Sequence, residues 1–249
     1  MQKSLADDKK FKGFSGSTLK IVAIITMLID HIGAVVLQPL VTKGIPLINL
    51  VFKPETIYDK LFFISRTIGR IAFPLFCFLL VEGFIHTSNI KKYALRLGIF
   101  ALISEIPFDL AFSSGILVDY SSQNVFFTLL IGLGALYFID KYKHNKALSL
   151  LSFLAACILA EFLHADYGMN GIIPIVLFYI TRNSKKHTMI AGIVSFLFEA
   201  PLFLAVYLSL PLIYFYNGKR GLNLKYFFYA FYPCHLLLLY LIKIIVINI

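Results

Sequence analysis

Several ionisable side chains stand inside long apolar runs of the sequence, where a charge is costly and usually faces a pathway or a reaction centre. Two of them are histidines, and an imidazole has a pKa near neutrality, which suits it to accept and donate protons in catalysis. A carboxylate beside a histidine can orient the ring, and an arginine can stabilise a developing oxyanion. The candidate catalytic residues are Asp30, His31, Arg70, Glu105, Asp109 and His235.

These candidates come from four apolar runs that would bring them to one level of a membrane. With the rise of an α-helix, Asp30 and His31 lie about 16–18 Å into their run. Arg70 lies about 13 Å into a run that crosses in the opposite direction. Glu105 lies about 18 Å into the next run, and His235 about 13 Å into the last. We expect a polar layer near the bilayer midplane; the alternative is that Arg70 and a carboxylate form only a buried ion pair that fixes helix packing.

The same apolar runs also contain prolines and small residues at helical spacing. A proline inside a helix removes one backbone hydrogen bond, and irregular backbone at membrane depth is tolerated where it lines a cavity. The prolines are Pro74, Pro107 and Pro233. Small residues at helical spacing favour close helix contacts, and the first run has Ala23, Thr26, Asp30 and Gly33 at that spacing.

The overall composition identifies a membrane protein. Hydrophobic residues make up 59% of the chain and charged residues 14%, against roughly a quarter charged in an ordinary soluble domain. Mean hydropathy is +0.83. The net charge of +10 does not indicate a nucleic-acid partner, because the basic residues are spread through short loops between apolar runs, as membrane topology requires. Membrane lipid is the expected partner.

Lysine and arginine in alternate loops predict the topology, since positive residues resist translocation. The tail and the loops after the second, fourth, sixth and eighth runs are basic, whereas the loops after the third, fifth and seventh have neither residue. We expect an all-α, polytopic transmembrane bundle of about nine spans with a cytoplasmic N-terminus. Three short runs leave eight spans as the alternative. The runs are 19–40, 61–85, 93–112, 125–139, 147–163, 168–181, 188–199, 202–216 and 226–247.

The chain reads as one domain over residues 1–249, with residues 1–18 as a cytoplasmic tail. The first run is too long for a signal peptide. No CxxC pair occurs, and no metal is expected. The motifs GxSxG and HExxH and a Gly-rich phosphate loop do not occur either, so any chemistry takes place within the membrane. A proton-coupled transporter would also place such charges at the midplane, and a structural component of a conjugation or secretion apparatus would need only their packing role.

Several blocks of the sequence resemble those of a known family. Successive blocks resemble the TraX family, the membrane proteins typified by the F-pilin N-acetyltransferase of conjugative plasmids. The resemblance covers most of the chain in order, and the segments GRIAFPLF and SEIPFD are its most specific parts. The blocks are LKIVAIITMLIDHIG, RTIGRIAFPLFCFLLVEGFIHT, KKYALRLGIFALISEIPFDLAF, SSQNVFFTLLIGL, ADYGMNGIIP and FYPCHLLLLYLI.

The resemblance implies a multi-pass acyltransferase of the bacterial inner (plasma) membrane that uses acetyl-CoA as acyl donor. The acceptor would be an amine or hydroxyl, such as the N-terminus of a pilin-like peptide or an envelope glycan. Because the donor is anionic and cytosolic, basic residues of an inner loop, Lys91, Lys92 and Arg96, are the candidates to hold its phosphates. Both His31 and His235 are candidates for the general base.

Overall fold

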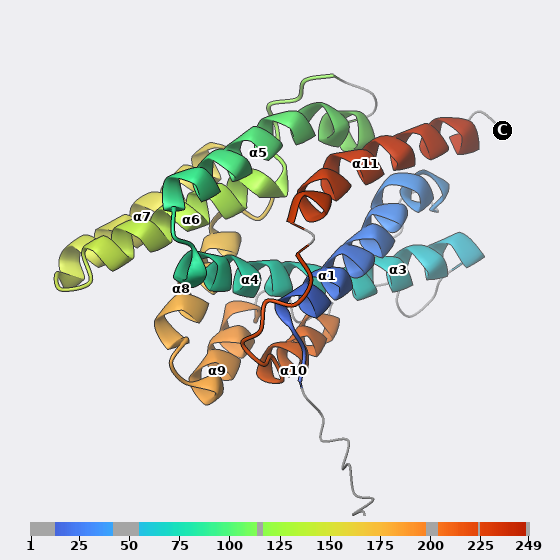
Figure 1. Ribbon diagram of the computed structural model, residues 1–249. Helices are drawn as coiled ribbons and strands as arrows, with labels where there is room; N and C mark the ends of the chain where they lie inside the picture. Colours follow the sequence, from blue (N-terminus) through green and yellow to red (C-terminus); the bar gives the residue numbers. More distant parts are fainter. Residues whose placement is uncertain (1–12, 42–54, 114–116, 198–203, 224, 248–249) are drawn as a thin grey trace, which may run out of the picture.

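The computed structural model describes residues 13–41, 55–113, 117–197, 204–223 and 225–247, which fold into helices joined by turns and short loops (Figure 1). The predicted all-α fold is confirmed, because these residues form isolated bridges but no strand. The first half contains α1 (Gly16–His31), the π-helix η1 (Ile32–Leu37), the 3₁₀-helix η2 (Gln38–Leu40), α3 (Ile57–Gly69), α4 (Ala72–His86) and α5 (Ile90–Phe112). The second half contains α6 (Val125–Lys141), α7 (Lys146–Phe162), α8 (Gly168–Thr181), α9 (Lys185–Ser195), the 3₁₀-helix η3 (Leu204–Leu208), α10 (Ser209–Tyr214) and α11 (Lys225–Ile247).

Helices occupy most of the described part of each of the nine apolar runs. By length and composition, three stretches of the described chain can cross a membrane: Gly16–Leu40, Ile57–His86 and Tyr226–Val246. Two shorter apolar helices, Gly168–Thr181 and Leu204–Tyr214, accompany them. The number of crossings and the side of the N-terminus stay predictions.

Polar residues cap the N-terminal ends of three helices that carry residues of the candidate site. The Ser15 side chain accepts a hydrogen bond from the Thr18 amide at the start of α1, and Asn89 accepts one from Lys92 at the start of α5. Asn124 does the same for α6 by accepting from the Phe126 amide. Each cap satisfies an amide that has no partner within its own helix, and so fixes the residue at which the helix begins.

The backbone departs from regular α-helix next to two of the predicted site residues. At the α3–α4 junction, Arg70 and Ile71 donate to carbonyls three residues back, with N···O distances of 3.3 and 3.2 Å. Pro74 has no N–H to donate to the Arg70 carbonyl, so the run breaks into two helices at this point. Directly after His31, the first run continues as the π-helix η1, a feature that is frequent at functional sites.

Three of the helices that carry site residues lie side by side. In Figure 1, α1 runs between α11 and α3, while α5 lies along the other side of α11. The helix α4 packs against α1 and α8, and α6 packs against α5, α7 and α8. The apolar core among them contains fully buried side chains such as Leu19, Leu75, Leu136, Ile175 and Phe178. This packing fixes α1, α5 and α11 around a common interior.

Glycines allow α1 and η1 to approach α3 closely. A Cβ atom at Gly33 would overlap the Ser65 side chain, and a Cβ atom at Gly69 would overlap the Asp30 side chain. The close helix contact expected of the small residues in the first run is therefore found at Gly33. The Gly69 contact places the backbone of α3 directly against the carboxylate that precedes His31.

We predict that Gly69→Ala destabilises the protein by about 1–3 kcal/mol, the usual cost of overpacking a close contact. The added methyl group must displace Asp30 or separate the two helices. Gly134→Ala on α6 is the matched control, because a Cβ atom there meets no atom within 4 Å. Thermal unfolding in detergent measures both, and equal melting temperatures for the two variants would contradict the close contact at Gly69.

Candidate active site

The two predicted histidines meet, although they are far apart in the sequence. His31 Nδ1 lies 2.7 Å from His235 Nε2, and the two rings are nearly parallel, with their centroids 5.0 Å apart. His31 is the last residue of α1, and His235 lies within α11 two residues after Pro233. The sequence prediction that these histidines share one layer is thereby confirmed for this pair.

Hydrogen bonding assigns the protons of the pair. His235 Nδ1 lies 2.8 Å from the carbonyl oxygen of Phe231, which can only accept, so Nδ1 carries the proton. In neutral His235 the Nε2 atom is then the acceptor, and the neighbouring His31 Nδ1–H is the donor. Neutral His31 therefore keeps its lone pair on Nε2, the nitrogen atom of the pair that is left to accept a further proton.

Aromatic rings surround the pair. The Phe112 ring meets His31 edge-on at a centroid distance of 5.5 Å, and the Phe231 ring stacks on His235 at 4.8 Å. Tyr232 contacts both imidazoles, at 6.0 Å from His31 and 5.6 Å from His235. His235 is 5% exposed and Tyr232 3%. These apolar faces keep bulk water away from His235.

An ion pair adjoins the histidines. Asp30 Oδ2 lies 2.5 Å from the Arg66 guanidinium, with the two side chains 17% and 24% exposed. The sequence prediction named Arg70 as the arginine of this layer and overlooked Arg66, one helical turn earlier on the same run. Arg70 lies at the α3–α4 junction, and its pairing with a carboxylate stays a prediction. The partial exclusion of water makes the Asp30–Arg66 pair a firm link between α1 and α3.

Glu105 and Asp109 form hydrogen bonds where α5, the start of α6 and the loop between them meet. Asn124 Nδ2 donates to Glu105 Oε2 and to the Ala101 carbonyl, each at 2.8 Å. Asp109 Oδ2 accepts from the Asp119 amide, also at 2.8 Å. The sequence predicts Glu105 at the level of the histidines. Its hydrogen bond joins α5 to the start of α6, that of Asp109 holds the loop between them, and a catalytic role for either carboxylate stays a prediction. Depth along a helix could not show that Glu105 accepts a hydrogen bond from Asn124, because that contact depends on how α5 packs against α6.

The loop that joins α5 to α6 is itself organised by Asp119. Hydrogen bonds from the Ser113 side chain and the Ser121 amide hold the pKa of the Asp119 carboxyl below its ordinary value. The side chain is half-buried and is ionised near neutral pH. Asp119 thus stabilises the loop between α5 and α6 and is not part of the histidine site.

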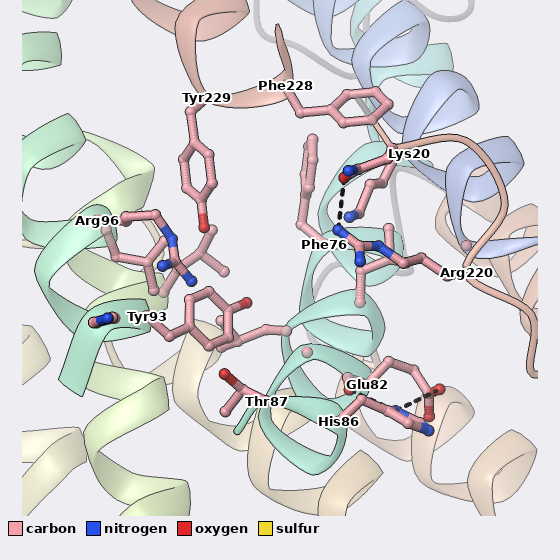
Figure 2. A pocket seen from close by; sticks show the side chains of 18 of the residues that line it. Lys20, Phe76, Glu82, His86, Thr87, Tyr93, Arg96, Arg220, Phe228 and Tyr229 are labelled. Atoms are coloured by element: carbon pink, nitrogen blue, oxygen red, sulfur yellow. Dashed lines mark hydrogen bonds and ion pairs between the residues drawn. The ribbon is translucent and has the colours of Figure 1, made fainter. Parts of the chain in front are cut away.

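A surface cavity of about 630 Å³ lies among the N-terminal ends of α1, α5 and α11, the C-terminal end of α4 and the loop 216–223 (Figure 2). Its size falls within the usual range for small-molecule sites. Three residues were predicted from the sequence to bind the phosphates of acetyl-CoA. Of these, Lys92 and Arg96 line the cavity, whereas Lys91 is not among the lining residues. Two further cations, Lys20 and Arg220, line it from α1 and from the loop; the sequence prediction did not single them out.

The cations stand on opposite walls. Figure 2 shows Arg96 on one side, and Lys20 and Arg220 on the other. Glu82 is a carboxylate among the lining residues, and it is engaged with His86, its neighbour one turn along α4. Aromatic rings complete the walls: Phe76, Tyr93, Tyr216, Phe228 and Tyr229. Positive charge beside aromatic faces suits an anionic ligand that carries a planar ring.

The wall that carries Arg220 is fixed by backbone hydrogen bonds. The Gly16 amide donates to the Lys219 carbonyl at 2.8 Å, and the Ser17 amide donates to the Arg220 carbonyl at 2.9 Å. Gly221 has φ of +71° and passes against the Ser15 and Ser17 side chains, where a Cβ atom would overlap them. The loop thereby supplies partners for the first amides of α1 and holds Arg220 near Lys20.

Three segments that the Lys/Arg pattern places in the cytoplasm meet at this cavity. They are the start of α1 after the tail, the turn between α4 and α5, and the loop before α11. The histidines lie deeper along the same helices: His31 about 16 Å beyond Lys20 on α1, and His235 about 9 Å beyond Tyr229 on α11. The described residues contain no group of three or more histidine, cysteine, aspartate or glutamate side chains that could hold a metal ion.

Comparison with known proteins agrees with the resemblance in the sequence blocks. The family model described as TraX protein matches residues 15–243. A curated relative, the probable fimbrial assembly protein FimC, serogroup H1, from Dichelobacter nodosus, is 32% identical over 251 residues, which cover 91% of this chain and 94% of the relative. No solved structure gives a significant match. The chain is a member of the TraX family.

Proposed function

We propose that this protein is a multi-pass acetyltransferase of the bacterial cell membrane, with its N-terminus in the cytoplasm, that moves an acetyl group from cytosolic acetyl-CoA to an amine or hydroxyl acceptor. The observation that carries the proposal is a basic, aromatic cavity on the same helices, α1 and α11, that carry a hydrogen-bonded histidine pair. The family and the fimbrial assembly name of the relative support a pilin-like acceptor.

The cavity fits the chemistry of the donor. The cations Lys20, Lys92, Arg96 and Arg220 would balance the phosphates, and the aromatic walls offer faces on which the adenine can stack. Acetyl-CoA supplies an acyl group activated as a thioester. The cavity opens among segments predicted to be cytoplasmic, the compartment that holds this donor.

The histidine pair suits general-base catalysis. As the acceptor nitrogen or oxygen forms its bond to the acetyl carbonyl carbon, His31 Nε2 takes the acceptor's proton. The carbon–sulfur bond breaks, the sulfur leaves with the bonding electrons, and the imidazolium returns the proton to that thiolate. His235 Nε2 accepts from His31 Nδ1–H and stabilises the positive charge that develops on the ring. The Asp30–Arg66 pair fixes the end of α1, and thereby the position of His31.

We predict that the protein in detergent binds coenzyme A saturably and that added salt weakens binding by screening the phosphates. Arg96→Gln and Arg220→Gln should each raise the Kd roughly threefold to tenfold, the loss expected for one charge-assisted contact. Lys143→Gln is the control, because Lys143 lies in the exposed α6–α7 turn outside the cavity. Isothermal titration calorimetry measures all four proteins.

A folded preparation that does not bind coenzyme A at millimolar concentration would overturn the donor assignment. Equal affinities for the Arg96, Arg220 and Lys143 variants would place the donor elsewhere on the protein. Proton-driven solute uptake by proteoliposomes, together with no coenzyme A binding, would favour the transporter alternative.

A further inference from the structure

A single aromatic layer stands between the cavity and the histidine pair. Phe126 and Tyr229 line the cavity, and the Phe126 ring meets Tyr232 edge-on at a centroid distance of 5.2 Å. Tyr232 in turn contacts His31 and His235. Phe126 thus contacts Tyr232, and Tyr232 contacts both imidazoles. These two rings alone connect the cavity wall with the histidine pair.

The layer is braced on both sides. Phe100 stacks on Tyr229 at 5.0 Å and lies 6.3 Å from the Phe126 ring. The Tyr232 hydroxyl interacts with the Val125 backbone amide, which belongs to the first turn of α6 and has no partner within that helix. Phe126 follows Val125 directly, so the two rings of the layer are anchored at one point, the start of α6.

We infer that Phe126 and Tyr232 form a partition that closes the histidine pair off from the aqueous cavity and yields only when the acyl group of a bound thioester passes it. Phe126 is 7% exposed, and it is the member of the partition that faces the cavity. Displacement of its ring gives the acyl group access to the imidazoles, whereas Tyr232 keeps its place beside the start of α6. The inference rests on the proposed function only for the identity of the ligand that passes.

The partition has a chemical consequence. Cavity water that reached His31 could add to the thioester carbonyl, giving its proton to Nε2, and the broken carbon–sulfur bond would leave acetate and free coenzyme A thiol. Exclusion of water from a reaction centre prevents this side reaction. The partition therefore directs the acetyl group to the acceptor and not to water.

A cysteine introduced behind the partition tests whether the partition excludes solvent, and this test does not require acetyl transfer to be measured. The background carries alanine in place of Cys77, Cys157 and Cys234, and His235→Cys supplies the reporter, because residue 235 is 5% exposed. The probe is a negatively charged methanethiosulfonate that enters through the aqueous cavity. Adding Phe126→Ala should raise the labelling rate roughly tenfold or more, since it removes the ring that excludes solvent.

The matched control is Phe138→Ala, which removes an exposed phenylalanine from the same helix, α6, away from the cavity. We expect it to leave the labelling rate unchanged. If Phe126→Ala fails to fold, as judged by gel filtration and helical circular dichroism, Phe126→Leu replaces it with a smaller expected acceleration. Equal labelling rates with and without the Phe126 ring would overturn the partition.

Two further measurements separate this inference from the proposed function. Coenzyme A should slow the labelling that Phe126→Ala permits; acceleration without this protection would support the partition and overturn the donor site. With His235 intact, Phe126→Ala should raise acceptor-independent release of coenzyme A thiol from acetyl-CoA, whereas Phe138→Ala should not. A thiol release that stays at the unsubstituted protein's level, while transfer continues, would contradict the role in water exclusion.

Discussion

His31→Asn is expected to lower acetyl transfer by about 10²–10⁴-fold, the usual contribution of a general base. The asparagine amide can occupy the position of Nδ1 and donate to His235 Nε2, so the hydrogen bond between α1 and α11 is kept. The variant lacks an equivalent of Nε2, which is the atom proposed to take the acceptor's proton. Turnover per folded molecule, measured by mass spectrometry of an acetylated pilin-like peptide, checks this prediction.

The comparison variant is His31→Gln. Its amide reaches the position of Nε2, cannot act as a base at neutral pH, and leaves the position of Nδ1 without a donor. We expect it to lose transfer to the same extent and to melt at a lower temperature than His31→Asn. Both variants should bind coenzyme A normally, because His31 does not line the cavity. Near-normal turnover by well-folded His31→Asn would remove His31 from the mechanism.

The second large effect concerns His235, which we assign as the residue that positions His31. His235→Gln places an amide oxygen where Nε2 accepts from His31, and it should keep transfer within about tenfold of the unsubstituted protein. His235→Asn retains a group at Nδ1 that can donate to the Phe231 carbonyl, but it leaves the His31 proton without an acceptor. That variant should lose about 10²-fold or more in turnover.

The contrast between the two His235 variants distinguishes positioning from catalysis. A residue that itself takes the acceptor's proton cannot be replaced by glutamine, so equal and severe loss in both variants would identify His235 as the base. Rescue by glutamine alone supports the assignment of His31. The melting temperatures of the two proteins serve as the control, because a purely structural role would lower stability and turnover together.

Much of the helical framework could be predicted from the sequence. Apolar runs set the extent of the helices because each must satisfy its own backbone hydrogen bonds away from water, and Pro74 marked the break between α3 and α4. The same reasoning placed His31 and His235 at comparable depth, and the structure brings them into contact. Basic loops marked one end of the molecule, where Lys92 and Arg96 line the cavity.

Only the tertiary structure decided which of these groups face one another. Rise per residue gives the position of a side chain along its helix, but the direction in which it points depends on how the helices pack. Arg66 therefore reaches Asp30, whereas Glu105 turns to Asn124. Lys20 and Arg220, 200 positions apart by their numbers, line one cavity because a loop is bonded to the start of α1. The proton arrangement of the histidine pair likewise depends on the Phe231 carbonyl, a contact that exists only once α11 is folded and packed against α1.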